Sequence, residues 1–321
     1  MSFYIAGTGS ALPEKVVTND DLAKFLDTSD EWIRTRTGIS RRHVLTTERL
    51  QDLAIRSAKI AMEEAGVSGA DLDLILCATM RADTFTPSLA CAVGEAVGSR
   101  APSFDLNAAC VGVLYCMEVA DSFIASGKAK TVLIVSAEAM SKLLDWTDRA
   151  SCVLFGDGAG AMVVKAGEGR LAGVLSTDPD THVIRMPNIE GLNSPYNEIA
   201  QEKLAMHMDG GEVYKFAVNA MGHNIEEVCK RAGLTPSDID WYLPHQANLR
   251  IIDASLKKFK IDKSKVLTNI ADCGNMSATS VMVLLDEYAK KGIFHKGDKL
   301  LFVAFGGGLT SGAVIIKWNK E

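Results

Sequence analysis

The sequence repeats itself at a fixed offset, and this repeat limits the possible folds more than any other feature. Asp71-Leu72-Asp73 follows an amphipathic helical pattern and precedes a short apolar run. Asp238-Ile239-Asp240 lies 167 residues later, again between a helical pattern and an apolar run. The same offset relates the apolar run around Leu133 to the one around Leu300. We therefore expect two halves of similar structure in one chain.

Each half alternates continuous apolar runs with helical patterns. Such runs are typical of strands that are buried on both faces, so we expect an α/β fold of two layered halves related by a pseudo-twofold axis. We place the halves at residues 1–168 and 169–321. The prolines, asparagines and glycines between about residues 167 and 212 predict a connection that runs over the surface. The alternative is a chance similarity between two α/β halves.

Length, charge and cysteine content exclude several classes of protein. A chain of 321 residues with 47% hydrophobic residues can fill a large core. Its net charge of -6 argues against a protein that binds nucleic acid or an anionic membrane. Its seven cysteines include no CxxC pair, which argues against a disulfide framework and a zinc site, so we expect no metal. The chain has no apolar run of membrane-spanning length and no basic start typical of a secretion signal, so we expect a cytoplasmic protein.

Cys110 is a candidate nucleophile. It stands near the start of a helical pattern, residues 108–117, that carries no charge and is apolar on every side, as in a buried helix. The unpaired N–H groups and the dipole at a helix start favour an anion, which predicts a lowered pKa for this thiol. The alternative, and the commoner case for a lone cysteine, is a small buried hydrophobic residue.

His245 and Asn275 are candidates to act with Cys110. His245 follows a short strand pattern that Pro244 ends, and it precedes a helical pattern. In α/β proteins such junctions often carry the chemistry, and an imidazole can exchange a proton near neutral pH. Asn275 lies in the second half's counterpart of the Cys110 loop and could donate a hydrogen bond without titrating. The structural alternatives are a histidine that caps a helix and an ordinary Gly-Asn turn.

Two glycine-rich runs do not predict a dinucleotide site. Residues 156–160 and 306–308 lead into apolar strand patterns, so neither run offers a helix N-terminus to a pyrophosphate. We expect both to form tight turns where the backbone approaches another group closely. The triple glycine at 306–308 could still offer a backbone N–H to an oxyanion.

Taken together, the motifs resemble those of the β-ketoacyl-acyl carrier protein synthase III family, condensing enzymes of the thiolase fold that start type II fatty acid synthesis. The resemblance covers nearly the whole chain. It is carried by Gly7-Thr8-Gly9-Ser10, residues 28–33 with 36–39, Asp105-Leu106-Asn107-Ala108-Ala109-Cys110, residues 155–160, Pro244-His245-Gln246-Ala247-Asn248-Leu249-Arg250, Gly274-Asn275 and residues 305–308. The thiolase fold that it implies agrees with the repeat.

The resemblance implies a role for each candidate. Cys110 would take the acyl group from acyl-CoA as a thioester. His245 and Asn275 would bind the carbonyl group of malonyl-acyl carrier protein, so that loss of carbon dioxide leaves an enolate that attacks the acyl group. The backbone N–H groups of Cys110 and Gly307 would form the oxyanion hole, and the product would be a 3-oxoacyl-acyl carrier protein. Coenzyme A thioesters are then substrates, and no tightly bound cofactor is implied.

The resemblance also implies binding surfaces. Trp32 and Arg149 would stack the CoA adenine, and the remaining channel residues would be Thr28, Arg36, Gly210, Tyr214, Ala247 and Asn248. Residues 250–265 carry six basic and two acidic side chains, although the whole chain is acidic. We expect an acidic acyl carrier protein to dock on Lys215, Arg250, Lys257 and Lys258; the alternative is an ordinary solvated helix face.

Two departures from the family pattern bear on the primer acyl group. Thr86 precedes Pro87 where the family commonly has phenylalanine, with Phe85 one place earlier, and residues 309–312 read Leu-Thr-Ser-Gly. In the family this first segment closes the partner's acyl pocket, so we expect a homodimer with a pocket roomier than acetyl needs. The alternatives are a same-fold acyltransferase or specialised condensing enzyme of secondary metabolism and, more distantly, a cysteine thioester hydrolase.

Overall fold

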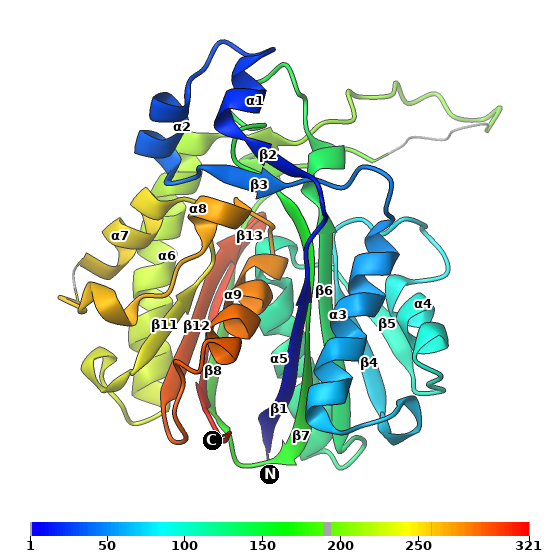
Figure 1. Ribbon diagram of the computed structural model, residues 1–321, viewed down its shortest axis with the longest axis vertical. Coiled ribbons are helices and arrows are strands. Elements are labelled where there is room, and N and C mark those ends of the chain that lie inside the picture. Colours follow the sequence, from blue (N-terminus) through cyan, green and yellow to red (C-terminus); the bar gives the residue numbers. More distant parts are fainter. Residues whose placement is uncertain (1, 189–193, 258, 321) are drawn as a thin grey trace.

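A computed structural model describes residues 2–188, 194–257 and 259–320. Two large sheets run through the molecule (Figure 1). The five-stranded sheet has the order β1 (Ser2–Ala11), β7 (Asp157–Gly167), β6 (Thr131–Ala139), β4 (Leu74–Ala78) and β5 (Ser103–Leu106). The four-stranded sheet has the order β8 (Arg170–Asp180), β13 (Gly308–Lys317), β12 (Lys299–Gly306) and β11 (Trp241–Pro244).

The two sheets have the same plan. In the first sheet β7 is antiparallel to both of its neighbours, β1 and β6, and β6 is parallel to β4. In the second sheet β13 is likewise antiparallel to β8 and β12, and β12 is parallel to β11. The place of β5 is taken in the second sheet by a single parallel bridge between Tyr242 and Val266. The strands β4 and β11 begin at Leu74 and Trp241, which are related by the offset of the sequence repeat. The prediction of two similar α/β halves is therefore confirmed.

Helices form three layers around these sheets (Figure 1). The helices α5 (Gly112–Ala125) and α9 (Thr279–Lys290) lie between the sheets, and their apolar side chains share one core with strands of both. The outer layers are α3 (Leu50–Ala65) with α4 (Leu89–Ala96) on the first sheet, and α6 (Gly210–Arg231) with α7 (Leu249–Lys257) on the second. The buried helix expected after Cys110 is thus α5.

Two glycines of β1 explain how closely α3 packs on the first sheet. A Cβ atom on Gly7 would lie 2.3 Å from the carbonyl oxygen of Ala61, and one on Gly9 would lie 2.3 Å from that of Ser57. Because glycine has no Cβ, the backbones of β1 and α3 can approach each other at these points.

The remaining elements gather mostly at one end of the sheets (Figure 1). They are β2 (Val16–Thr18), α1 (Asn19–Ala23), α2 (Asp30–Thr37), β3 (Arg41–His43), β9 (Ile184–Arg185), β10 (His207–Met208) and α8 (Ile270–Cys273). Short 3-10 turns occur at Gly69–Asp71, Ala109–Val111, Met140–Leu143, Pro236–Asp238 and Lys263–Lys265. In the described ranges, no helix has both the length and the apolar content needed to cross a lipid bilayer.

The predicted surface connection between residues 167 and 212 is wrong in its first part. Residues 170–180 form β8, and only the chain after residue 180 leaves the sheet. The prediction failed because β8 is largely exposed after residue 175 and contains Pro179, so its sequence looks like a loop. The proposed boundary between residues 168 and 169 falls between β7 and β8, which belong to different sheets, and it stays a prediction.

Candidate active site

Cys110 lies in the 3-10 turn between β5 and α5, as expected for a residue near a helix start. Its sulfur accepts a hydrogen bond from the Ser277 hydroxyl at 3.4 Å. Ser277 is the counterpart of Cys110 in the second half, because the two residues are 167 positions apart. The two halves therefore meet at these two side chains.

The turn between β12 and β13 reaches close to Cys110. A Cβ atom on Gly306 would lie 2.8 Å from the backbone nitrogen of Cys110 and 3.0 Å from its Cβ. Only glycine leaves room for this approach. The next residue, Gly307, lines the same cavity as Cys110. As expected, the run 306–308 forms the turn that leads from β12 into β13. The tight turn expected at 156–160 is wrong, because residues 157–160 already belong to β7.

Burial controls the ionisation of the Cys110 thiol. Although one side of the residue meets the cavity, the surrounding protein raises the pKa of the thiol to about 11, and the Ser277 hydrogen bond opposes this only in part. The lowered pKa expected from the helix start is therefore wrong for the free protein. The desolvation of the thiolate outweighs the favourable effect of the helix terminus.

His245 follows β11 directly and is 1% exposed. Its ring lies edge-on to Phe305, with 5.5 Å between the ring centroids. Burial lowers the pKa of His245 to about 3, so the imidazole is neutral near pH 7. Its Nδ1 atom is buried and has no hydrogen-bond partner in the described part of the chain. Any polar contact with a substrate must therefore be made through Nε2.

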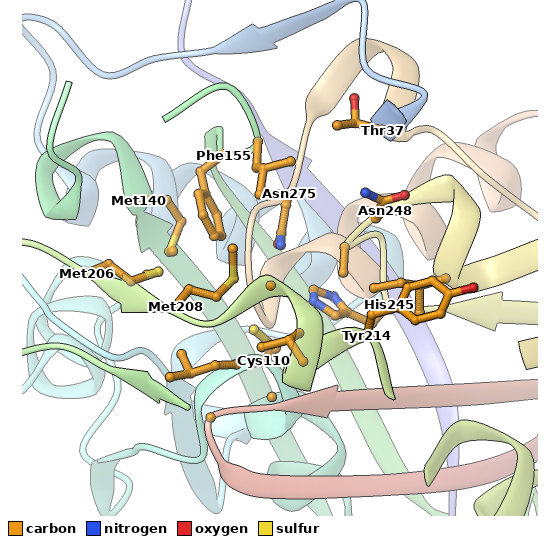
Figure 2. Close-up of a pocket in the computed structure, with 18 of the residues that line it drawn as sticks. Thr37, Cys110, Met140, Phe155, Met206, Met208, Tyr214, His245, Asn248 and Asn275 are labelled. Atoms are coloured by element: carbon orange, nitrogen blue, oxygen red, sulfur yellow. The ribbon is translucent and has the colours of Figure 1, made fainter. Parts of the chain in front are cut away.

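Asn275 lies between α8 and α9 and has a fixed amide orientation. Its Oδ1 atom accepts a hydrogen bond of 2.8 Å from the backbone N–H of Ser277. Its backbone donates to Leu154 and accepts from Gly156, at 2.9 and 3.0 Å. With the oxygen occupied, the amide nitrogen is left to donate into the cavity, and Figure 2 shows it turned that way.

These residues line one cavity of about 270 Å³. Figure 2 shows Cys110, His245 and Asn275 facing a common space, with Met206, Met208 and other apolar side chains around it. Ile184, Met206 and Met208 belong to the segment that connects the halves, so this segment supplies one wall of the cavity. Among the described residues, no group of three His, Cys, Asp or Glu side chains could hold a metal ion.

Most of the residues expected to bind CoA line this cavity. These are Trp32, Arg36, Gly210, Tyr214, Ala247 and Asn248. Arg149 does not line it, but its Cζ atom lies 5.3 Å from the centre of the Trp32 ring, and the Arg36 Cζ lies 4.6 Å from that centre. Thr28 lies outside the cavity wall, and its hydroxyl is buried without a partner among the described residues.

The expected docking residues divide between two grooves. Arg250 and Lys257 line one groove together with Lys260 and Lys263, and Tyr214 lies both in this groove and in the main cavity. Lys215 lines a different groove and pairs with Glu212 at 2.7 Å. Lys258 lies outside the described residues.

The residues expected in the acyl pocket lie beside the main cavity. Phe85 is 74% exposed and lines a neighbouring cavity of about 600 Å³, which shares Ala109 and Gly307 with the first. Thr86 is exposed and lines neither cavity. The expectation that both residues enter a partner's site stays a prediction.

Sequence reasoning missed several residues of the site. Ser277 was given no role, although it lies 167 residues after Cys110 and the repeat offset therefore singles it out. Glu138 is buried next to the site and was not considered; its signal was a lone charge in the otherwise uncharged strand β6. For Met140, Met206 and Met208 we find no sequence signal, since isolated methionines occur in any core.

Comparisons with known proteins agree with this geometry. Family models described as 3-oxoacyl-[acyl-carrier-protein] synthase III and its C-terminal part match residues 104–182 and 229–318. A β-ketoacyl-[acyl-carrier-protein] synthase III of Clostridium acetobutylicum is 42% identical over 323 residues, which cover 99% of each chain.

Solved structures resemble the whole chain. The 3-oxoacyl-[acyl-carrier-protein] synthase III of Aquifex aeolicus VF5 matches with a TM-score of 0.92 and 42% identity, covering 98% of this chain and 100% of that one. The priming β-ketosynthase of the R1128 polyketide pathway matches with a TM-score of 0.93 and 33% identity, covering 99% and 97%. The chain belongs to the 3-oxoacyl-[acyl-carrier-protein] synthase III family of condensing acyltransferases.

Proposed function

We propose that this chain catalyses the decarboxylating condensation that starts type II fatty acid synthesis. An acyl group from acyl-CoA would be joined to a malonyl group on acyl carrier protein, giving a 3-oxoacyl-acyl carrier protein. The observation that carries the proposal is one apolar cavity in which a thiol, a neutral imidazole and an oriented amide face each other. Full-length relatives named for this reaction support it.

In the first half-reaction, the Cys110 sulfur attacks the acyl-CoA carbonyl carbon. A new carbon–sulfur bond forms, the bond to the CoA sulfur breaks, and the thiol proton ends on the departing CoA thiol. The thiol starts out neutral because its pKa is raised to about 11. The backbone N–H groups of Cys110 and Gly307 stabilise the oxyanion of the tetrahedral intermediate, since donors fixed at that point need no reorganisation.

In the second half-reaction, His245 and Asn275 hold the malonyl thioester carbonyl. A buried N–H without a partner is costlier than a buried lone pair, so the proton of the neutral His245 ring lies on Nε2 and can be donated. The Asn275 amide nitrogen is the second donor. Both donors stabilise the enolate oxygen that develops as the carbon–carboxylate bond breaks and carbon dioxide leaves.

The enolate carbon then attacks the acyl-Cys110 carbonyl. The electron pair left by carbon dioxide forms the new carbon–carbon bond, and the bond to Cys110 breaks to release the thiolate. The thiolate then takes a proton from water, since its original proton left with CoA. Splitting the reaction in this way avoids a three-body encounter and uses a thiolate as both nucleophile and leaving group.

Features at the cavity mouth support the two thioester substrates. Trp32 lies at the mouth with two guanidinium groups near its ring, an arrangement able to stack an adenine and neutralise phosphates. The groove with Arg250 and Lys257 begins beside Tyr214, so an acidic carrier protein bound there would have its pantetheine arm close to the channel. We assign the carrier protein to this groove.

We also propose a cytoplasmic homodimer that holds no tightly bound cofactor. The strand β5 pairs with β4 at the end of the five-stranded sheet, and its Phe104 is 38% exposed. An edge strand with an exposed aromatic residue is a suitable surface for a second copy. All seven cysteines are free, which supports a reducing compartment.

Intact mass spectrometry tests the function directly. Incubation with acyl-CoA should add one acyl group to the protein, and malonyl-acyl carrier protein should then remove it as a 3-oxoacyl product. Cys110→Ser should take no acyl group, whereas Cys91→Ser, which changes an exposed thiol, should behave like the wild type. Steady release of free acid without a malonyl donor would indicate a hydrolase instead. Acylation without condensation would indicate an acyltransferase.

A further inference from the structure

Glu138 is a buried carboxyl group next to the catalytic cavity that the mechanism above does not use. It is 1% exposed and lies near the end of β6. The backbone N–H of Met80 donates to it, with distances of 3.1 and 3.3 Å to its two oxygens. The neighbouring acid Asp157 on β7 adds a repulsive interaction. A carboxylate in such a place is poorly stabilised, because an ionised acid loses its hydration on burial.

The surroundings favour the protonated form of Glu138. Burial raises the pKa of this carboxyl group well above its usual range, and Asp157 acts in the same direction. The hydrogen bonds from Met80 and Ser277 oppose this shift but are smaller than the effect of burial. A protonated carboxyl group has one O–H to donate, and its carbonyl oxygen can still accept from Met80.

Ser277 connects this carboxyl group to the nucleophile. Its hydroxyl lies 3.4 Å from the Cys110 sulfur. The Ser277 side chain is also close enough to Glu138 to be among the groups that lower the pKa of that carboxyl group. Its backbone is held in place, because its N–H donates to Asn275 Oδ1 at 2.8 Å. Its φ of 52° lies in the left-handed region that few side chains adopt. Ser277 is therefore fixed between Glu138 and Cys110.

The single hydroxyl proton of Ser277 decides the direction of these hydrogen bonds. If Glu138 were ionised, it would accept this proton, and the Cys110 thiolate would lose its donor while facing a second anion. If Glu138 is protonated, it donates to Ser277 Oγ, and the Ser277 proton is free for the sulfur. The cavity is also lined by His245, whose imidazole is neutral near pH 7, and by Arg36 and Tyr214. Only the protonated form of Glu138 therefore supports a thiolate.

We propose that Glu138 is a positioning residue, which in its protonated form fixes the Ser277 hydroxyl as a donor to Cys110 and thereby stabilises the thiolate. No proton leaves Glu138 or Ser277 along this chain of hydrogen bonds. The proposal deepens the proposed function, since it rests on Cys110 as the nucleophile. Glu138 belongs to the first half of the molecule and Ser277 to the second, so both halves would contribute to the support of the nucleophile.

Alkylation of Cys110 by iodoacetamide at a series of pH values tests the proposal without any substrate. The exposed thiol of Cys91 is first removed by Cys91→Ser, and the rate at Cys110 is followed by peptide mapping. Glu138→Gln keeps a neutral donor of the same shape, so its pH profile should match that of the parent within about twofold. Glu138→Leu removes the donor, and its midpoint should rise by about one pH unit, with roughly tenfold slower alkylation near pH 8.

Ser277→Ala is the second variant, so that the proposal can still be tested if Glu138→Leu does not fold. It should shift the profile by the same amount, and combining it with Glu138→Leu should add little, because both changes break one chain. A parent-like profile in Ser277→Ala or in folded Glu138→Leu would overturn the proposal. A shift in Glu138→Gln as large as in Glu138→Leu would also overturn it. Failure to accept acyl-CoA would contradict the proposed function but would leave these profiles unchanged.

Discussion

Replacement of Gly306 by alanine should impair acylation of Cys110 much more than it impairs the fold. The added Cβ would lie 2.8 Å from the Cys110 nitrogen, whereas ordinary contacts begin at 3.4 Å. The end of β12 and the Cys110 turn must therefore separate by ~0.6 Å, the difference between these two distances. The nearest atom belongs to the backbone and the next is the Cβ of Cys110, which the backbone fixes, so no flexible side-chain end can absorb the shift.

The shift displaces the two N–H groups assigned to the oxyanion hole. Loss of one such donor costs roughly 10²–10³ in rate, and a misplacement of about 1 Å can cost roughly 10². Because the shift at Gly306 is smaller than that, we expect a single-turnover acylation rate about 10- to 100-fold below the wild type. Overpacking should lower the free energy of unfolding by about 1–3 kcal/mol, which leaves the protein folded for the assay.

Rapid quenching of the acyl-CoA reaction, followed by intact mass, measures this rate. Gly211→Ala is the matched control: it lies in the first turn of α6, and its nearest neighbour would be Asp209 Oδ1 at an acceptable 3.4 Å. This control should acylate at the wild-type rate. If Gly306→Ala acylated within twofold of the wild type and kept its stability, the close approach would not be what positions the donors.

Four further predictions follow from the site and its surroundings. Since the pKa of His245 is lowered to about 3, the malonyl decarboxylation rate should show no inflection near 6.5, and one there would contradict a neutral donor. The pKa of Glu138 is raised in the folded state, so the wild type should lose free energy of unfolding relative to Glu138→Gln as the pH rises above 4.5, the ordinary pKa of a glutamate. A difference in the free energy of unfolding that does not change with pH would refute this. Arg250→Glu should raise the Michaelis constant for malonyl-acyl carrier protein but spare acylation by acyl-CoA, with Lys230→Glu as control; equal loss in both half-reactions would argue against docking. In a competition between acetyl-CoA and hexanoyl-CoA, the wild type should be acylated by hexanoyl-CoA at least as fast as by acetyl-CoA, and Thr86→Phe should shift this preference toward acetyl-CoA. Strict acetyl selectivity in the wild type would exclude a roomier pocket.

The sequence predicted the fold well where strands are buried on both faces. The strands β4, β6, β11 and β12 each contain a continuous apolar run, and the repeat placed these runs in two equivalent sheets. β8 escaped prediction because one part of it is exposed and polar, so neither apolar content nor alternation marks it. The strand β8 lies at the edge of its sheet and forms through its hydrogen bonds with β13. Because β13 lies far along the chain, the sequence of β8 alone does not reveal this pairing.

In the site, residue types were predictable but their environments were not. Cys110, His245 and Asn275 were found because each follows a recognisable strand end or precedes a helix. The raised pKa of Cys110 could not be found in this way, because it depends on how much protein surrounds the thiol in three dimensions. The same holds for Ser277, whose contact with Cys110 joins segments far apart in the chain, and for Glu138, whose burial depends on the three-dimensional packing.

The meeting of Cys110 and Ser277 at equivalent positions has a consequence for the origin of the protein. In an ancestor assembled from two identical half-length chains, the same residue would have stood on both sides of the axis. Two cysteines there, in place of a sulfur and an oxygen 3.4 Å apart, would be prone to oxidise to a disulfide and lose their nucleophilic character. After gene duplication and fusion, each side could mutate alone. One half could then keep the thiol of Cys110. The other half could acquire the hydroxyl of Ser277, which donates a hydrogen bond to that thiol and cannot form a disulfide with it.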